Sequence, residues 1–207
     1  MTKKTPTSGP VVAVSNLKGG TGKTVLAIHL AYVLGATLLD LDPQGDAVDW
    51  CRRSGLVTGH HVHGQEEVFH LLGVIKGPVV LDSPPGENEN LRMALAFADV
   101  AVIPVKAGSS DLRALGRMQF LIKAAREVNP HLRGAIVLNE AKSVSTLSRD
   151  METALEGLKG MTYLGHLGDR VAIPEAIANG EVVGGSSAAD EVMAIADNLS
   201  TLLKGKR

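Results

Sequence analysis

The sequence predicts an α/β fold, a single domain with a mostly parallel, doubly wound sheet covered by helices on both faces. Short runs rich in Val, Leu and Ile alternate with helical patterns from end to end, as expected when strands and helices alternate. Aromatic residues make up only 3% of the 207 residues, so Ala, Val, Leu and Ile must build the core, which is common in parallel sheets. The length suits one compact domain with a sizeable core.

The expected strands are short, rich in β-branched residues and without polar alternation, which is typical of strands buried on both faces. They cover residues 11–15, 36–42, 77–82, 100–105 and 134–140, with a further strand near 163–166 and a short edge strand around Val62. The expected helices show apolar residues at helical spacing. They cover residues 23–34, 46–53, 66–75, 91–98, 111–128, 146–158, 171–179 and 188–203, and Gly35 ends the first of them.

The two ends and the composition restrict the class of protein. Residues 1–10 are expected to form a flexible leader, residues 11–203 the domain and residues 204–207 a basic tail. The leader lacks the apolar core of a secretory signal, and no apolar run approaches the length of a membrane-spanning helix. Cys51 is the only cysteine, which favours a reducing cytoplasm. Since the formal net charge is −1, nucleic-acid binding would have to come from a local basic patch.

The stretch SNLKGGTGKT, residues 15–24, lies between the first expected strand and the first expected helix. An ordinary phosphate-binding loop reads G-x-x-x-x-G-K-[ST], but Leu17 stands where its first glycine belongs, and an extra lysine, Lys18, follows. The loop glycines let backbone N–H groups turn around anionic oxygens, and the positive end of the next helix points at them. These glycines are Gly19, Gly20 and Gly22.

Two further side chains suit phosphate and metal binding. Lys23 is placed to reach the β- and γ-phosphates, and Thr24 can bring its hydroxyl to Mg²⁺. Lys18 can lie near the same triphosphate, which would neutralise the two crowded lysines, or reach a nucleotide held by a second copy of the chain. A solvated loop lysine is the alternative for Lys18. A tight turn without ligand is the alternative for the loop, and its strand–turn–helix context disfavours that interpretation.

KGGTGKT, residues 18–24, resembles the deviant Walker A motif of the ParA/MinD ATPases. In that family the extra lysine contacts the phosphates across a dimer that sandwiches two ATP molecules, and the first glycine is not required. The resemblance implies a P-loop NTPase domain with ATP and Mg²⁺ as cofactors, slow intrinsic hydrolysis of ATP, an ATP-dependent homodimer and a catalytic role for Lys18. It implies nucleotide binding by Lys18, Gly19, Gly20, Thr21, Gly22, Lys23 and Thr24.

The second expected strand leads into a D-x-D-P-Q-G stretch that matches the family letter for letter. The matching residues are Asp40, Asp42, Pro43, Gln44 and Gly45. A carboxylate at a strand end can face the attacking water, and by the resemblance Asp40 positions or activates that water. Asp42 is expected to support the loop or the metal shell. A turn former or helix cap is the alternative for any single Asp, but the full match argues against it.

Further matches follow along the chain. VVLDSPPG has the Walker B form, which implies that Asp82 holds Mg²⁺ together with Thr24, while Pro84 and Pro85 are expected to stiffen the loop that senses the γ-phosphate. Asn139 lies where related proteins often read the adenine edge. Strand VAVIPV and the D-L of the following loop match another family pattern, and its acid, Asp111, is expected to cap a helix in any case.

The resemblance extends from residue 11 to about residue 183, where DRVAIPEAIANGEVV is similar to the element that packs over the nucleotide and the dimer face. Arg170 in this element falls near a basic residue that contributes to DNA binding in some relatives. Because only ten residues precede the first expected strand, the resemblance is greatest to short plasmid-partition ParA proteins, which lack an N-terminal helix-turn-helix domain.

The resemblance implies a partition-type ATPase, cytoplasmic and associated with the nucleoid. Its dimer would bind DNA without sequence preference, and a ParB-like or other small adaptor carrying the cargo would stimulate hydrolysis and reset the cycle. The cargo could be a plasmid, a chromosome origin or a protein body such as a carboxysome or chemoreceptor cluster. The basic candidates are Lys123, Arg126, Arg133, Lys142, Arg149, Arg170 and Lys204. The predicted DNA contacts among them are Arg126, Lys142, Arg149 and Arg170.

Two other functions compete with this one. A MinD-like ATPase at a membrane surface would need a basic amphipathic C-terminal helix, but Asp190, Glu191 and Asp197 of the last helix would be repelled by an anionic membrane, so no stable membrane association is expected. A metabolic amidoligase or synthetase would need extra polar loops around a substrate pocket, and the chain is short between its motifs. Iron–sulfur reductases are excluded, since Cys51 alone cannot ligate a cluster.

Several reactive side chains have ordinary explanations. Four histidines fall close together, but a surface loop explains them better than a metal site. They are His60, His61, His63 and His70. Cys51 is expected to be a packed small residue. Ser83 and Ser109 lack a His–Asp arrangement, so nucleophilic catalysis has no support.

Overall fold

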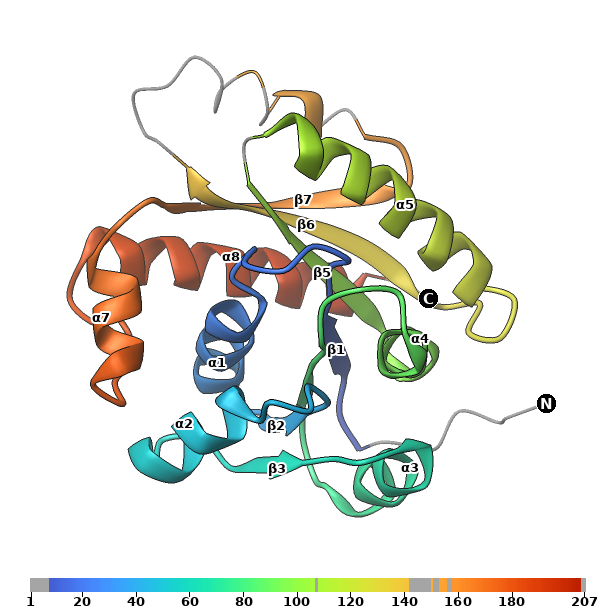
Figure 1. Ribbon diagram of the computed structural model, residues 1–207, viewed down its shortest axis with the longest axis horizontal. Coiled ribbons are helices and arrows are strands. Elements are labelled where there is room, and N and C mark those ends of the chain that lie inside the picture. The colour runs from blue at the N-terminus through green and yellow to red at the C-terminus, as the bar shows by residue number, and fades with distance from the viewer. Residues whose placement is uncertain (1–7, 107, 142–149, 151–152, 156–157, 206–207) are drawn as a thin grey trace.

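Seven parallel strands form one sheet in the order β3-β2-β4-β1-β5-β6-β7 (Figure 1). The computed structural model describes residues 8–106, 108–141, 150, 153–155 and 158–205. Every pairing between neighbouring strands is parallel, which requires connections that cross a face of the sheet. The predicted doubly wound α/β fold is therefore confirmed.

The strands are short in the centre of the sheet and longer toward β7. Their bounds are β1 Val11–Val14, β2 Thr37–Asp40, β3 Gly59–His61, β4 Val79–Asp82, β5 Val100–Val105, β6 Arg133–Ala141 and β7 Met161–Gly168. The helices are α1 Lys23–Leu34, α2 Asp46–Ser54, α3 Gln65–Val74, α4 Glu89–Phe97, α5 Ser109–Ala125, α7 Ala172–Ala178 and α8 Ser187–Lys204. The expected helix at 146–158 falls largely outside the described residues.

The helices divide into two groups that cover opposite faces of the sheet (Figure 1). Val11 and Ala13 of β1 pack into a core with α3, α4 and α5, whereas Val12 and Val14 pack into a core with α1, α2, α7 and α8. This alternation follows from the two-residue period of a strand, since neighbouring side chains point to opposite faces. Both faces of the central strands are buried, which explains why their sequences are continuously apolar.

Several boundaries differ from the sequence expectations. β2 ends at Asp40 and not at residue 42, because the following residues turn, with the Gly45 amide donating to the carbonyl of Asp42 at 3.0 Å. The edge strand β3 precedes Val62, and β7 is longer than expected at both ends. α5 begins two residues early at Ser109, so its N-terminal cap is Gly108. The expectation that Asp111 caps this helix is therefore wrong, and Asp111 lies inside its first turn.

The described parts of the two expected ends pack against the domain. The hydroxyl of Ser8 donates to the carbonyl of Ile75 at 3.1 Å and accepts from the amide of Gly77 at 2.9 Å. At the other end, α8 includes Lys204. Within the described ranges, no helix has the length and apolar character needed to cross a membrane.

Candidate functional site

The candidate site lies at the edge of the sheet where β1, β2 and β4 end. The phosphate-binding loop leaves β1 here and enters α1 at Lys23. Asp82, the last residue of β4, pairs in register with Val14 of β1 and with Asp40 of β2. Because the carboxyl ends of parallel strands share one edge, the loop and both acids converge as the sequence predicts.

Glycine is required at the turn into α1. Gly22 is the N-cap of this helix and has φ +85°, in the left-handed region that favours glycine. A Cβ added there would lie 2.2 Å from Nδ2 of Asn139, so a larger residue would displace that amide. The same nitrogen donates to the carbonyl of Thr21 at 2.9 Å, so Asn139 ties β6 to the loop. Its predicted contact with adenine stays a prediction.

The two loop lysines are held differently. Lys23 is buried, and its ammonium donates to the carbonyl of Lys18 at 3.2 Å. Burial lowers the pKa of Lys23, while the nearby charges of Asp82 and Asp42 act in the opposite direction. The ammonium of Lys18 lies 2.8 Å from Oδ2 of Asp111, and its side chain is 40% exposed. Lys18 is therefore at the rim of the site, where a second molecule can reach it.

Asp82 has the environment of a metal ligand. It is buried, Thr24 donates a side-chain hydrogen bond to it, and its Oδ1 has no hydrogen-bond partner among the described groups. Burial raises the pKa of Asp82 to about 8, with the hydrogen bond from Thr24 opposing the shift. A buried carboxylate oxygen without a partner, beside a hydroxyl, fits a Mg²⁺ ion, which would favour the ionised carboxylate.

Protein side chains alone would not complete such a metal shell. The described part of the chain contains no group of three or more His, Cys, Asp or Glu residues that could hold a metal ion. Mg²⁺ usually keeps several waters and binds through one or two carboxylates plus substrate phosphates. The pair of Asp82 and Thr24 therefore fits a cation that arrives with a nucleotide.

The two acids after β2 differ in what their carboxylates contact. Asp40 is fully buried, and its two oxygens accept from the amides of Asp42 and Val48, each at 3.0 Å. Burial raises the pKa of Asp40, and these two hydrogen bonds oppose the shift. Asp42 is half-buried and accepts only from the amide of Gln44 among the described hydrogen bonds, at 3.0 Å. Its charge acts on both Lys23 and Asp82.

A small cavity lies directly beside the loop, on the β6 side. Its volume is about 140 Å³. It is lined on one side by Gly22 and Val25 and on the other by Asn139, Arg170 and Pro174. The structure thus brings the loop close to Asn139 and to residues 168–174.

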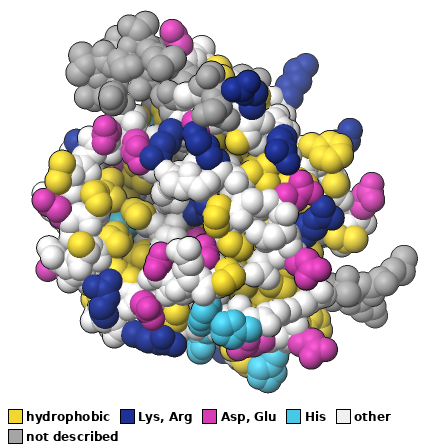
Figure 2. Space-filling model, viewed as in Figure 1, with side chains coloured by type: hydrophobic (Ala, Val, Ile, Leu, Met, Phe, Trp, Pro, Cys, Tyr) yellow, Lys and Arg dark blue, Asp and Glu magenta, His cyan; other side chains and the backbone are white. Residues whose placement is uncertain are grey.

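The histidine cluster contains a contact that the sequence analysis missed. Figure 2 shows histidine side chains gathered over the lower part of this face. His61 pairs in register with Asp40, and its Nε2–H donates to the carbonyl of Asp42 at 2.9 Å. Its ring also lies against Gly45, where an added Cβ would meet Cε1 at 3.3 Å. The sequence signal that could have revealed this contact is the short edge strand expected around Val62. Pairing of that strand with β2 brings His61 next to Asp40.

The structure describes two of the four residues predicted to contact DNA, Arg126 and Arg170. The Nε–H of Arg126 donates to the carbonyl of Leu132 at 2.9 Å, and Arg170 forms an ion pair with Glu191. Lys142 and Arg149 lie outside the described residues. Of the wider set, Arg133 donates to carbonyls at the end of α8, including that of Gly205 at 3.3 Å. Three of the seven basic candidates, Arg126, Arg133 and Arg170, therefore bind groups of the domain itself.

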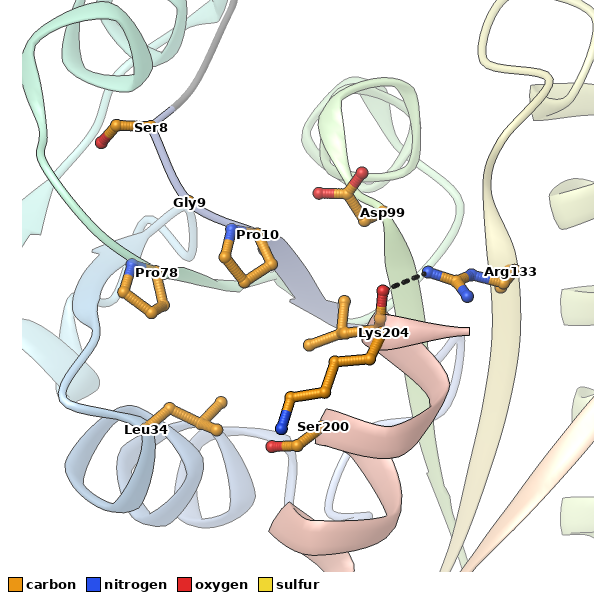
Figure 3. Close-up of a pocket in the computed structure, with 10 residues that line it drawn as sticks. Ser8, Gly9, Pro10, Leu34, Pro78, Asp99, Arg133, Ser200 and Lys204 are labelled. Carbon is orange, nitrogen blue, oxygen red and sulfur yellow. Dashed lines mark hydrogen bonds between the residues drawn. The ribbon is translucent and has the colours of Figure 1, made fainter. Parts of the chain in front are cut away.

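A cavity of about 560 Å³ lies at the opposite edge of the sheet (Figure 3). Pro10, Pro78 and Asp99 line it, and each comes directly before a strand. Arg133 projects toward the end of α8 beside Lys204 in this view. Because the phosphate-binding loop leaves the other end of these strands, the cavity does not belong to the candidate site.

The chain is similar in sequence to known proteins. The chain matches the description "CobQ/CobB/MinD/ParA nucleotide binding domain" over residues 12–183. It is 31% identical over 199 residues to the maintenance of carboxysome distribution protein A of Halothiobacillus neapolitanus, covering 87% of this chain and 92% of that protein. It is 28% identical to the chromosome partitioning protein ParA of Myxococcus xanthus, covering 80% of this chain and only 60% of that protein.

A solved structure extends the comparison to the fold. A Borrelia burgdorferi B31 protein, described as a plasmid partition protein and bound to AMPPNP, superposes with a TM-score of 0.78 at 17% identity. The match covers 94% of this chain and 99% of that one. The predicted family is confirmed: the chain belongs to the CobQ/CobB/MinD/ParA family of nucleotide-binding domains.

Proposed function

We propose that this chain is a partition-type ATPase that binds ATP with Mg²⁺, dimerises around the nucleotide and positions a cargo along DNA. The observation that carries the proposal is the convergence of the loop, Thr24, Asp82 and Asp42 at one edge of the sheet, with Lys18 at its rim. The relatives named above are a carboxysome distribution protein and a chromosome partitioning protein, which supports a positioning role.

Different residues of the site bind the phosphates, the metal ion and the base. Backbone N–H groups of the loop and the ammonium of Lys23 bind the phosphates, while Thr24 and Asp82 hold the metal ion. The cavity beside Gly22 and Asn139 receives the base. When bound, ATP supplies the bond to be cleaved, and Mg²⁺ neutralises charge on its phosphates. Lys18 extends to the phosphates held by the second copy, after leaving Asp111.

Asp42, and not Asp40, is the better candidate for orienting the attacking water. Both carboxylate oxygens of Asp40 already accept backbone hydrogen bonds inside the domain. Asp42 is half-buried, and its charge reaches Lys23 and Asp82. We therefore revise the sequence-based assignment: Asp40 holds the loop in place, and Asp42 acts on the water.

A protein body such as a carboxysome is the cargo class that the comparisons favour. The carboxysome relative is matched over 92% of its length, whereas the match to the chromosome partitioning relative covers 60% of that protein. A membrane-surface role has less support. Val192, Ile195 and Leu199 of α8 are buried in the core, and Glu191 forms an ion pair with Arg170.

Binding to random-sequence duplex DNA tests the proposal. We expect binding of the full chain only with ATP and Mg²⁺, weakening steeply with salt, because phosphate contacts release counterions. The chain without nucleotide and the chain with ADP are the comparisons, and Lys18→Ala is the matched variant that should bind ATP without binding DNA. Absence of DNA binding with every nucleotide at low salt would contradict the proposal.

A further inference from the structure

The outer side of α5 carries an exposed aromatic ring between two hollows. Phe120 is 71% exposed, the largest such fraction, shared with Val171, among the large apolar side chains of the described residues. A hollow of about 280 Å³ lies on one side of it and a hollow of about 270 Å³ on the other. Val128, which is 63% exposed, lines the second hollow. An apolar ridge between hollows is the form that interaction surfaces take.

The first hollow, which we call the α5 groove, combines an apolar floor with basic walls. Ile122 is buried and Met161 partly buried, and both contribute to the groove. Lys123, Arg126 and Lys159 line the same groove. No acid lines it among the described residues. Figure 2 shows Lys and Arg side chains on the upper right of the molecule, over α5, with hydrophobic side chains between them.

These cations have few partners inside the domain. In the part of the chain that the structure describes, the side chains of Lys123 and Lys159 make no hydrogen bond or ion pair. Arg126 uses its Nε–H for the carbonyl of Leu132, which fixes the guanidinium at the groove. Three like charges around one hollow are favourable when a partner brings carboxylates to them.

We propose that the α5 groove binds a short acidic peptide segment of the cargo adaptor, with one large apolar side chain seated beside Phe120. Charge complementarity selects acids for the three cations, and the apolar floor selects the anchor. A DNA backbone is the weaker fit, because phosphates use the cations but leave the aromatic ridge and the floor without a partner. An acidic peptide is thus the chemical class of the adaptor segment, and this assignment rests on the partition function proposed above.

Selection from a displayed library of random peptides of about 12 residues tests this inference. The full chain with ATP and Mg²⁺ is the target. We expect the selected peptides to share several acids around one large apolar residue. The consensus peptide, labelled with fluorescein, is then titrated with the full chain, and anisotropy gives its affinity. Peptides without an acidic and apolar consensus would overturn the inference.

Matched variants locate the binding surface. Phe120→Ser and Lys123→Glu should each weaken the consensus peptide by about tenfold or more, since anchors and close charge pairs dominate such interfaces. Phe69→Ser on α3 and Arg113→Glu at the start of α5 change exposed residues outside the groove and should leave the affinity unchanged. Equal affinities for all four variants would overturn the inference.

The same variants separate this inference from the proposed function. If Lys123→Glu removes ATP-dependent DNA binding and Phe120→Ser changes neither DNA nor peptide binding, the groove is a DNA contact and the inference fails alone. If the wild-type chain binds DNA with ATP but selects no peptide, the inference again fails alone. If it selects groove-dependent peptides without any binding of DNA, the partition function fails and the peptide site stands.

Discussion

The ammonium of Lys18 forms an ion pair with Asp111, a residue 93 positions further along the chain, at 2.8 Å. Lys18 belongs to the phosphate-binding loop, and Asp111 to the first turn of α5. Asp111 is almost fully buried, whereas Lys18 is 40% exposed. The rim lysine is therefore held within its own chain, and it must leave this acid before it can contact a nucleotide bound by a second copy.

Asp111→Asn should make dimerisation easier. The change keeps the shape of the side chain but removes the charge that holds Lys18. A partly exposed ion pair is worth up to about 1 kcal/mol and a symmetric dimer breaks two of them, so the variant should dimerise at a protein concentration up to about thirtyfold lower. Sedimentation velocity with a non-hydrolysable ATP analogue measures this, with Lys18→Ala as the control that stays monomeric. Unchanged or weaker dimerisation of Asp111→Asn would mean that the ion pair does not oppose assembly.

Asp40→Ala should lower the stability of the protein, whereas Asp42→Ala should slow the hydrolysis of ATP. Without Asp40, the amides of Asp42 and Val48 lose their acceptor, which should cost about 2 kcal/mol and lower the unfolding midpoint by several degrees. Asp42→Ala should keep its midpoint and ATP affinity but hydrolyse ATP at least about a hundredfold more slowly. Thermal denaturation and single-turnover hydrolysis separate the two. Normal hydrolysis by Asp42→Ala would return the water-orienting role to Asp40.

His61 should affect hydrolysis through the position of Asp42. Its Nε2–H holds the carbonyl of Asp42, so His61→Leu should slow hydrolysis by about tenfold while ATP affinity stays the same. His61→Gln offers an amide donor at a similar reach and should recover most of the rate. Exchange of the Gln44 and Gly45 amides in the nucleotide-free protein should rise in the Leu variant only. Equal rates for both variants would assign His61 a packing role.

His29 should make the protein less stable in acid. Its Nδ1–H donates to the carbonyl of Val25 at 2.7 Å, and Nε2 accepts from the amide of Val183 at 3.3 Å, which requires the neutral ring. Burial lowers the pKa of His29 below its ordinary value of 6.5, against the opposing effect of the Val25 carbonyl. Below that value the unfolded chain binds the extra proton and the folded chain does not, so stability falls as pH falls.

Urea denaturation at about pH 7.5 and about pH 5.5 measures this effect. The wild-type chain should lose more stability between the two pH values than His29→Gln, which cannot titrate there. If the free energy of unfolding falls equally in the two proteins, groups other than His29 determine the loss of stability in acid. Burial raises the pKa of Asp82 to about 8, so this carboxyl also changes the stability between the two pH values, but it does so in both proteins, and the difference between the wild-type chain and His29→Gln reports His29.

The fold and the phosphate-binding loop were predictable because local signals set them. Continuous apolar runs mark the buried strands, and Gly22 has a left-handed backbone that the loop motif implies. The hydrogen bonds that distinguish Asp40 from Asp42 were not predictable. Asp40 and Asp42 are two residues apart in one motif, and only the turn after β2 determines that both oxygens of Asp40 but one oxygen of Asp42 accept hydrogen bonds from backbone amides.

The other features that the sequence did not reveal depend on contacts between segments that are distant in the chain. The ion pair of Lys18 with Asp111 and the contact of His61 with Asp42 depend on which strands become neighbours in the sheet. The basic candidates show the same limit, since a charge count does not reveal that Arg170 is engaged by Glu191. Composition identifies the cations, and the three-dimensional arrangement decides which of them remain available to a partner.

The cavity at the amino edge of the sheet has a practical consequence. Ser8 and Lys204 both line it, so the two ends of the described chain lie close together, at the edge away from the nucleotide loop. A fluorophore or a surface tether attached at either end would leave the nucleotide face open. A short flexible linker between residues 8 and 204 would close the described chain into a ring, and opening that ring at an exposed turn would give a permuted protein whose nucleotide loop lies away from the join.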